Sequence, residues 1–338
     1  MKFGPTLLSQ AEGAILAHSI ALPSGRLRKG QLLTPAHLKE LSSLGLDQVI
    51  VARPDPDDVL ENDAALRVAQ ALVPNPLATN LTLSKPFTGR VNLIANGPGV
   101  VCLDRDRLHA LNRIDPMLTL ATVPEHQQMS DRGMVATVKI ISYALPAKSL
   151  DTAESLLRGS AALTLAVPKL NSARLIVTEI PGGAGEKGVK AIESRLHALN
   201  MTLDHVMRVP HRLDDIRQAL TATDQTDMTL ILTGSATSDP HDIAPLSLRL
   251  AGGQVERFGM PVDPGNLLFL GNLSGRPVIG LPGCARSLAL NGADWVLSRV
   301  ACGVPITSDD IAGMGIGGLL KEIPTRPQPR AGKATAKG

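Results

Sequence analysis

The residues best suited to chemistry lie in the stretch LTGSATSDPHDIAP, residues 232–245. Hydroxyl side chains surround a glycine in its first half, at the end of an expected strand. Glycine and short hydroxyl residues can surround a phosphate with backbone N–H groups and side-chain donors. The sequence therefore predicts a phosphate-binding loop, and its candidate ligand-binding residues are Thr233, Gly234, Ser235, Ala236, Thr237 and Ser238.

Two carboxylates follow in the second half of that stretch. Asp239 and Asp242 could hold Mg²⁺ beside a phosphate, because this ion takes few protein ligands. They are therefore the candidate catalytic residues. The alternative is that Asp239 or Asp242 is simply the N-cap of the expected helix, which their position also fits. His241, which lies between them, is expected to be a surface histidine rather than a metal ligand.

A second candidate is LPGCARS, residues 281–287, between an expected strand and an expected helix over residues 287–303. A helix N-terminus attracts anions, and Arg286 and Ser287 could contact one there. The helix dipole and the guanidinium would lower the pKa of the Cys284 thiol. No histidine is close in sequence to act as its base, which favours a packed small cysteine. The candidate ligand-binding residues of this loop are Pro282, Gly283, Cys284, Arg286 and Ser287.

Two glycine-containing turns complete the candidate site. PGGAGEKG, residues 181–188, has the Gly-x-Gly-x-x-Gly spacing of a dinucleotide-binding loop. The acidic residue that should close the next strand is missing, because Asp204 lies at that strand's start, and the ending of a Walker loop is missing too. These two absences favour a flexible glycine loop at the ligand-facing edge of the sheet, and NAD binding is the weaker alternative. The candidate residues are Gly182 and Gly183, together with Pro264, Gly265 and Asn266 of the turn DPGN.

A regular alternation of expected strands and helices between Asn171 and Cys302 positions these loops. Such alternation is typical of βαβ units and predicts the α/β fold class with a mainly parallel sheet. Ligands of such sheets bind beyond the carboxyl ends of the strands. We therefore expect the loops after Ile180, Leu232 and Leu281 to lie at one edge of the sheet.

The chain of 338 residues is long enough for two or three domains. A first region covers residues 1–73 and contains a helix expected to begin at Thr34 and Pro35. A mixed, more β-rich region covers residues 74–170. The α/β domain covers residues 171–304, and a C-terminal extension covers residues 305–338. The end of this extension is rich in Pro, Lys, Ala and Gly and is expected to be disordered.

Composition excludes several classes of function. Hydrophobic residues make up 43% of the chain and charged residues 19%, as in soluble globular proteins. The few aromatic residues are scattered, whereas stacking platforms for single-stranded nucleic acid need them clustered. The net charge of +3 arises in the tail, because residues 321–338 carry +4. The body of the chain therefore gives no reason to expect a nucleic-acid partner.

The cysteines and the termini indicate a cytoplasmic protein. The three cysteines lie far apart without a Cys-x-x-Cys pair, which excludes the usual zinc spacings and suits a reducing compartment. The N-terminal segment is a poor signal peptide, and no run of 18 apolar residues occurs. No membrane partner is expected.

Several segments resemble a known family. The order of strand, TG loop and helix, followed by MPVDPGN, LPGCARS and NGADWVL, resembles the molybdopterin-binding (MoaB/Mog-type) fold. GAILAHSI and LRKGQLLTPAHLKELSSLGLDQVIVA resemble the N-terminal region of molybdopterin molybdotransferases. The whole is similar to a bacterial branch of molybdopterin-binding proteins that often carries a C-terminal nucleotidyltransferase.

This resemblance implies a three-layer α/β/α domain preceded by a mixed α+β N-terminal region. The implied ligand is molybdopterin or its nucleotide form, held in the TGSATSD and LPGCARS loops. Asp239, Asp242 and Glu179 would be the ligands of a possible Mg²⁺. A nucleotidyltransferase partner and a homo-oligomer, dimer or trimer, are also implied.

The sequence departs from the molybdotransferase pattern at two turns. The family's Lys-Pro-Gly-Lys turn is Asp263-Pro264-Gly265-Asn266 here, and its Leu-Pro-Gly-Asn-Pro ends as Leu-Pro-Gly-Cys-Ala. Aspartate in place of lysine repels an anion such as molybdate instead of attracting it. Two hypotheses follow: Mg²⁺-dependent, transferase-like processing of adenylylated molybdopterin, or a non-catalytic module that presents the cofactor to a nucleotidyltransferase.

Overall fold

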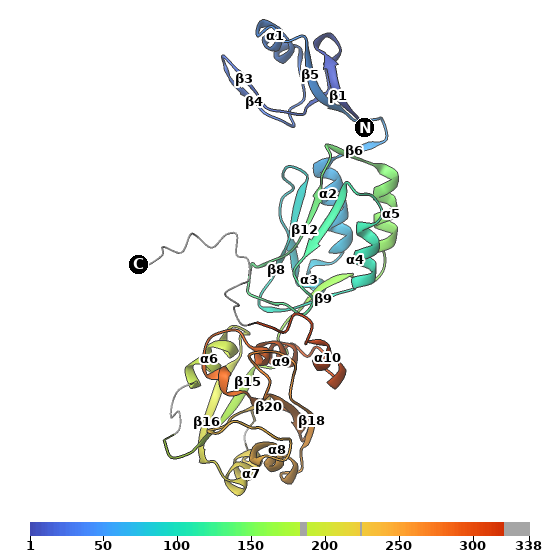
Figure 1. Ribbon diagram of the computed structural model, residues 1–338. Helices are drawn as coiled ribbons and strands as arrows, with labels where there is room; N and C mark the ends of the chain where they lie inside the picture. Colours follow the sequence, from blue (N-terminus) through green and yellow to red (C-terminus); the bar gives the residue numbers. More distant parts are fainter. Residues whose placement is uncertain (183–187, 224, 321–338) are drawn as a thin grey trace, which may run out of the picture. The chain divides into compact units, whose positions relative to one another are not determined.

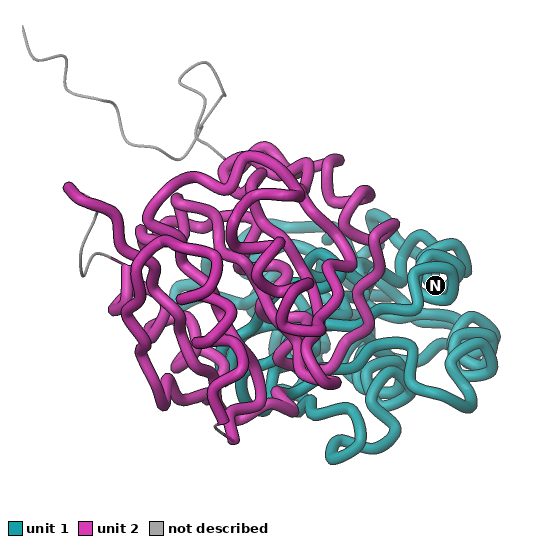
Figure 2. Tube along the Cα trace, turned by 90° about the horizontal axis from the view of Figure 1, so that it is seen from below, with its two compact units in different colours: residues 1–167 teal, residues 168–338 magenta. Residues whose placement is uncertain are grey.

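The computed structural model describes residues 1–182, 188–223 and 225–320. The chain divides into two compact units, residues 1–167 and residues 168–338 (Figure 2). Helices and strands are mixed throughout, which confirms the α/β class. No helix among the described residues is long and apolar enough to cross a membrane.

The first part of unit 1 is a small β-rich subdomain. Its antiparallel sheet has the order β1-β5-β2, and its core includes Leu16, Leu33, Leu41 and Val51. Thr34 caps α1 and Pro35 is the first helical residue, as predicted. The elements are β1 (Lys2–Leu7), η1 (Leu8–Gln10), β2 (Ile15–Leu16), β3 (Ile20–Leu22), β4 (Gly25–Leu27), α1 (Pro35–Ser43) and β5 (Gln48–Arg53).

The rest of unit 1 packs helices on one face of an antiparallel sheet of order β10-β12-β8-β7 (Figure 1). A second sheet has the order β11-β9-β14, and β13 pairs with β6. The strands are β6 (Asp58–Leu60), β7 (Leu81–Leu83), β8 (Arg90–Ala95), β9 (Gly99–Leu103), β10 (Leu118–Thr122), β11 (Gln128–Met129), β12 (Met134–Ile140), β13 (Ala144–Pro146) and β14 (Leu163–Ala166). The helices are α2 (Glu61–Leu72), α3 (Pro76–Thr79), α4 (Arg105–Asn112) and α5 (Ala147–Leu157).

Unit 2 is built on a six-stranded sheet of order β16-β15-β17-β20-β19-β18. Helices α7 and α8 pack on one face, and Figure 1 shows α6 and α9 on the other side. The strands are β15 (Ser172–Glu179), β16 (Thr202–Pro210), β17 (Met228–Leu232), β18 (Gln254–Phe258), β19 (Phe269–Leu273) and β20 (Arg276–Leu281). The helices are α6 (Val189–His197), α7 (Leu213–Thr221), α8 (Ile243–Leu250), η2 (Gly283–Arg286), α9 (Gly292–Ala301) and α10 (Ser308–Gly313).

The sheet of unit 2 is mixed, so the predicted parallel pairing is found in one part of it and not in the other. The pairings β16-β15, β15-β17 and β17-β20 are parallel, whereas β20-β19 and β19-β18 are antiparallel. The physical reason is the connection from β19 to β20. It consists of Ser274 and Gly275, both with positive φ, and a two-residue turn joins only antiparallel neighbours.

One helix begins later than predicted. The sequence placed a helix from residue 287, but α9 starts at Gly292, and the LPGCARS loop contains only the four-residue η2. The reason is Asn291, whose side chain accepts a hydrogen bond from the N–H of Ala293, while Asp294 accepts one from the N–H of Asn291. This capping box defines the helix start five residues after Ser287.

Candidate functional site

Three neighbouring strands of unit 2 end together. The register aligns Val177 of β15 with Leu232 of β17, and Leu232 with Leu281 of β20. Since these strands are parallel, the loops that follow them leave the same edge of the sheet. This register brings three of the predicted loops, which begin at residues 180, 233 and 282, to one edge.

The first contact between these loops is made by a buried threonine. Thr178 Oγ1 accepts a hydrogen bond of 2.8 Å from the N–H of Gly234 and lies 2.8 Å from His211 Nδ1. A Cβ at position 234 would lie 2.7 Å from the carbonyl oxygen of Thr178, so only glycine permits this approach. Gly234 therefore has a structural reason to be glycine, whatever it binds.

The residues of the TGSATSD loop separate into two groups. Thr233 and Thr237 are buried, and their hydroxyl groups lie 3.3 Å apart. Ser235, Ala236 and Ser238 are exposed. The buried threonines hold the loop in shape, and the exposed residues are the ones that a ligand can reach.

Arg286 links the LPGCARS loop to the other two. Its Nη2 donates a hydrogen bond of 2.8 Å to the carbonyl oxygen of Thr233. Gly188, at the end of the glycine-rich loop, has a φ of +105°, and a Cβ there would lie 2.9 Å from Arg286 Cγ. Partial burial lowers the pKa of Arg286. A half-buried cation therefore lies where all three loops meet.

Cys284 is not an activated thiol. Burial raises its pKa, although Arg195 acts in the opposite direction. The dipole expected to lower it is not present at this loop, because α9 begins only at Gly292. The cysteine therefore stays protonated near neutral pH, which agrees with the prediction of a packed small residue.

Sequence reasoning missed the residue that organises the LPGCARS loop. Arg195, on α6, is 9% exposed. Its guanidinium donates to the carbonyl oxygens of Ala285, Ser287 and Ala289 at 3.0, 2.7 and 3.1 Å and to Asp294 Oδ1 at 2.5 Å. Nothing in the helix sequence distinguishes Arg195 from a surface arginine. His211 was also missed, although its position just after β16 places it at the same edge of the sheet.

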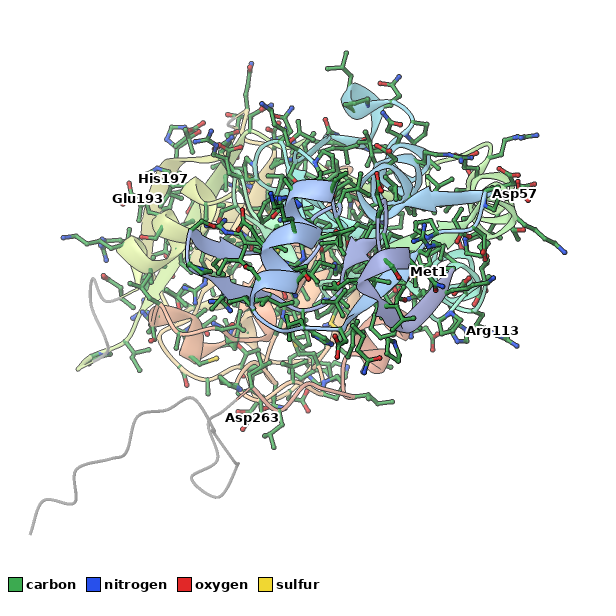
Figure 3. The ribbon with its side chains drawn as sticks, turned by 90° about the horizontal axis from the view of Figure 1, so that it is seen from above. Met1, Asp57, Arg113, Glu193, His197 and Asp263 are labelled. Atoms are coloured by element: carbon green, nitrogen blue, oxygen red, sulfur yellow. The ribbon has the colours of Figure 1, made fainter. Side chains whose placement is uncertain are left out.

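The DPGN turn lies against the start of α9. The carbonyl oxygen of Pro264 accepts a hydrogen bond of 2.8 Å from the N–H of Gly292, and a Cβ on Gly265 would lie 2.7 Å from that nitrogen. Asn266 Nδ2 donates to the carbonyl oxygen of Met260. Asp263, labelled in Figure 3, is exposed, and its backbone pairs with Gly318 and Leu320. These contacts explain the turn without a ligand.

The three predicted metal ligands have separate structural roles. Asp242 is the N-cap of α8 and accepts from the N–H groups of Ile243 and Ser238 at 2.7 and 3.1 Å. Asp239 accepts from the N–H of His241, and this bond lowers the pKa of Asp239. Glu179 forms an ion pair of 3.3 Å with Arg208.

The fit of a metal ion can be tested on this arrangement. The described ranges contain no group of three or more His, Cys, Asp or Glu side chains that could hold a metal ion. The bond from Ile243 to Asp242 confirms the N-cap interpretation of Asp242, and no three-carboxylate Mg²⁺ site forms in the part of the chain that the structure describes.

The glycine-rich loop is described only at its ends. Gly182 is exposed with a φ of +73°, and Gly188 precedes α6. Gly183, and with it most of the dinucleotide-binding pattern, lies outside the described residues, as does the basic tail after Leu320. Strand β16 ends in Arg208, Val209 and Pro210, so no carboxylate stands where NAD binding requires one.

Comparisons with known proteins give one partial sequence match and distant structural likenesses. Residues 5–53 match a family model described as a domain of unknown function (DUF8806). This match covers the small β-rich subdomain of unit 1 and none of the candidate site. A search of curated proteins gave no match.

Among solved structures, the chain is similar to molybdopterin and molybdenum cofactor biosynthesis proteins of Pyrococcus. A moeA protein from Pyrococcus horikosii has a TM-score of 0.31 at 13% identity, over 90% of this chain and 76% of that one. A molybdenum cofactor biosynthesis protein from Pyrococcus furiosus has a TM-score of 0.22 at 12% identity, over 92% and 65%. A moeA protein from Pyrococcus horikoshii OT3 has a TM-score of 0.23 at 10% identity, over 92% and 75%. Likeness at this level carries no argument about this chain.

Proposed function

We propose that unit 2 binds molybdopterin or its nucleotide form, with the phosphate at the carboxyl edge of the sheet. One observation carries this proposal: the TGSATSD and LPGCARS loops are joined there by the bond from Arg286 to Thr233. Two of the segments that resemble the molybdopterin-binding fold, TGSATSD and LPGCARS, meet at this edge. We also propose that unit 2 has the three-layer α/β/α architecture of that family.

The chemistry of the edge suits a phosphate. Ser235 and Ser238 of one loop and Ser287 of the other are exposed, and the guanidinium of Arg286, which joins the two loops, is half-buried. Hydroxyl groups donate to phosphate oxygens, and a charge-assisted bond from a guanidinium is about twice as strong as a neutral one. Because partial burial disfavours the charged form of Arg286, a bound anion would recover part of that free energy.

The proposed role is binding without metal-assisted turnover. A Mg²⁺ ion would stabilise the charge that develops in phosphoanhydride chemistry. The carboxylates expected to hold it have other partners, since Asp242 caps α8 and Glu179 pairs with Arg208, and this supports a binding role. Asp263 in place of the family's lysine also disfavours molybdate. We infer a cytoplasmic module that presents the cofactor to a nucleotidyltransferase and that forms a dimer or trimer.

Substitution of an exposed serine tests the proposal. Ser235→Asp places a negative charge beside the proposed phosphate, and we expect it to weaken molybdopterin binding about tenfold or more, as measured by anaerobic calorimetry. Ser274→Asp is the matched control, because Ser274 is exposed on the turn at the opposite end of the same sheet. It should bind like the wild type.

Two outcomes contradict the proposal. Equal affinities of Ser235→Asp and the wild type would exclude this edge as the phosphate site. Mg²⁺-dependent turnover of adenylylated molybdopterin in the presence of molybdate would show an enzyme rather than a binding module. Size-exclusion chromatography with light scattering tests the dimer or trimer independently.

A further inference from the structure

His211 follows β16 at the carboxyl edge of the sheet in unit 2, outside the two loops proposed to bind phosphate. The register pairs Glu179, the last residue of β15, with Pro210, so His211 leaves the sheet at the same edge as the TGSATSD loop. Its backbone N–H donates a hydrogen bond of 2.9 Å to the carbonyl oxygen of Glu179. The half-buried ring is held by a second bond, at Nδ1. Both the backbone and the ring of His211 are therefore fixed at this edge.

The hydroxyl group of Thr178 determines which nitrogen of His211 carries the proton. Thr178 is 1% exposed, and its Oγ1 accepts a hydrogen bond from the N–H of Gly234. The hydroxyl hydrogen still needs an acceptor, because a buried donor without a partner costs free energy. Among the described residues, that acceptor is His211 Nδ1, which lies 2.8 Å from Thr178 Oγ1. Nδ1 therefore accepts, and the neutral imidazole carries its hydrogen on Nε2.

The Nε2–H group of His211 is a donor without a partner among the residues that the structure describes. The two nitrogens lie on different sides of the imidazole ring, so Nε2 lies on the side away from the buried Thr178. It is not one of the buried atoms that lack a partner in the described ranges, so solvent reaches it. A donor that is already fixed in place loses little entropy when it binds a ligand.

This donor lies close enough to the TGSATSD loop to share one phosphate with it. The Gly234 nitrogen and His211 Nδ1 bond to the same oxygen, so Nε2 lies at most about 8 Å from that nitrogen. A phosphate that accepts from two donors spans about the same distance, because each bond adds about 2.8 Å to the separation of its oxygens. The carboxylate of Glu179 forms an ion pair of 3.3 Å with Arg208, which offsets its repulsion of an anion at this edge.

We propose that His211 is a ligand-binding residue and donates a hydrogen bond from Nε2 to an oxygen of the phosphate bound at this edge. The inference rests on the proposed function, because it takes the phosphate to lie at the TGSATSD loop. Thr178 then joins two parts of the site: its oxygen holds the N–H of Gly234, and its hydroxyl hydrogen keeps the proton of His211 on Nε2. An N–H group only donates, so it suits a fully ionised phosphate, whose oxygens only accept.

Two substitutions of His211 separate donation to the ligand from support of Thr178. Asparagine places its amide near the position of Nδ1, where the carbonyl oxygen can accept from Thr178, but it has no group near Nε2. Glutamine is longer and places its amide near Nε2, where its NH₂ group can donate to a phosphate. In anaerobic calorimetry on the full chain, we expect His211→Asn to weaken molybdopterin binding about tenfold. His211→Gln should bind about threefold or more tighter than His211→Asn.

His205→Asn is the matched control, because His205 is an exposed histidine of the same strand and pairs with Arg174, far from the carboxyl end. It should bind like the wild type. The tautomer is measured separately, by NMR of the full chain with isotope-labelled histidine at mildly alkaline pH. We expect the hydrogen of His211 on Nε2, and a hydrogen on Nδ1 would overturn the proposal.

The binding measurements can overturn the proposal in two further ways. Wild-type affinity of His211→Asn would exclude the bond from Nε2. Weakening by His211→Gln that equals or exceeds the weakening by His211→Asn would show that the histidine acts only through Thr178.

Ser235→Asp separates this inference from the proposed function. If Ser235→Asp weakens binding and His211→Asn does not, only the role of His211 fails. Wild-type affinity of Ser235→Asp, or a wild type that does not bind molybdopterin, excludes the phosphate from this edge and the role of His211 with it.

Discussion

At the scale of single residues, Arg195 determines the shape of the candidate site without facing a ligand. Its bonds hold the carbonyl oxygens of Ala285, Ser287 and Ala289 in one arrangement. Arg195→Met removes these bonds and leaves Asp294, whose side chain is only 13% exposed, without its cation. We expect a loss of about 3 kcal/mol in the free energy of unfolding, as measured by urea titration.

A double-mutant cycle separates this ion pair from general packing. The combination of Arg195→Met with Asp294→Leu should cost less than the sum of the two single changes, by more than about 1 kcal/mol, because neither charge is then left unpaired. Strict additivity of the two substitutions would show that Arg195 and Asp294 act independently.

At the scale of elements, a bidentate ion pair joins α2 to α5. Arg67 Nε and Nη2 donate to the two carboxylate oxygens of Glu154 at 2.7 and 3.0 Å. The hydrogen bond to Arg67 lowers the pKa of Glu154. A carboxyl group with a lowered pKa contributes stability above the pKa of the unfolded chain and loses it as the pH falls through the folded value.

Glu154→Gln should therefore destabilise the protein at pH 7 but not at strongly acidic pH. Both side chains are about one-third exposed, so solvent screening limits the expected loss to less than about 1 kcal/mol. Thermal midpoints of the variant and the wild type, compared between pH 3 and pH 7, measure it. A difference that stays constant down to pH 3 would show that the charge of Glu154 is not its cause.

At the scale of the whole molecule, the two units have separate cores. Unit 1 contains one cluster around Leu16 and Leu41 and a larger one around Val68 and Leu93. A cluster around Ile176 lies in unit 2. Residues 1–167 and residues 168–338, expressed separately, should each unfold cooperatively in urea, as monitored by circular dichroism. A piece without a cooperative transition would show that its core depends on the other unit.

Local sequence patterns were sufficient for several features. Thr34 and Pro35 define the start of α1, because a cap and a fixed φ act within one turn of helix. Asp242 is identifiable as an N-cap for the same reason. The alternation of strands and helices after Asn171 placed three loops at one edge, because parallel strands share their carboxyl ends. The family resemblance and the choice of ligand rest on the sequence alone.

Only the tertiary structure decided the contacts that shape the candidate site, because these contacts join residues far apart in the chain. Arg195 reaches the carbonyl oxygen of Ser287, 92 residues away, and Thr178 meets Gly234, 56 residues away. The cap at Asn291 moved the expected helix start away from Cys284, and burial then raised the pKa of that thiol instead of lowering it. The contacts of Arg195 and Thr178 both join segments that only the folded sheet brings together, so no local pattern in the sequence could show them.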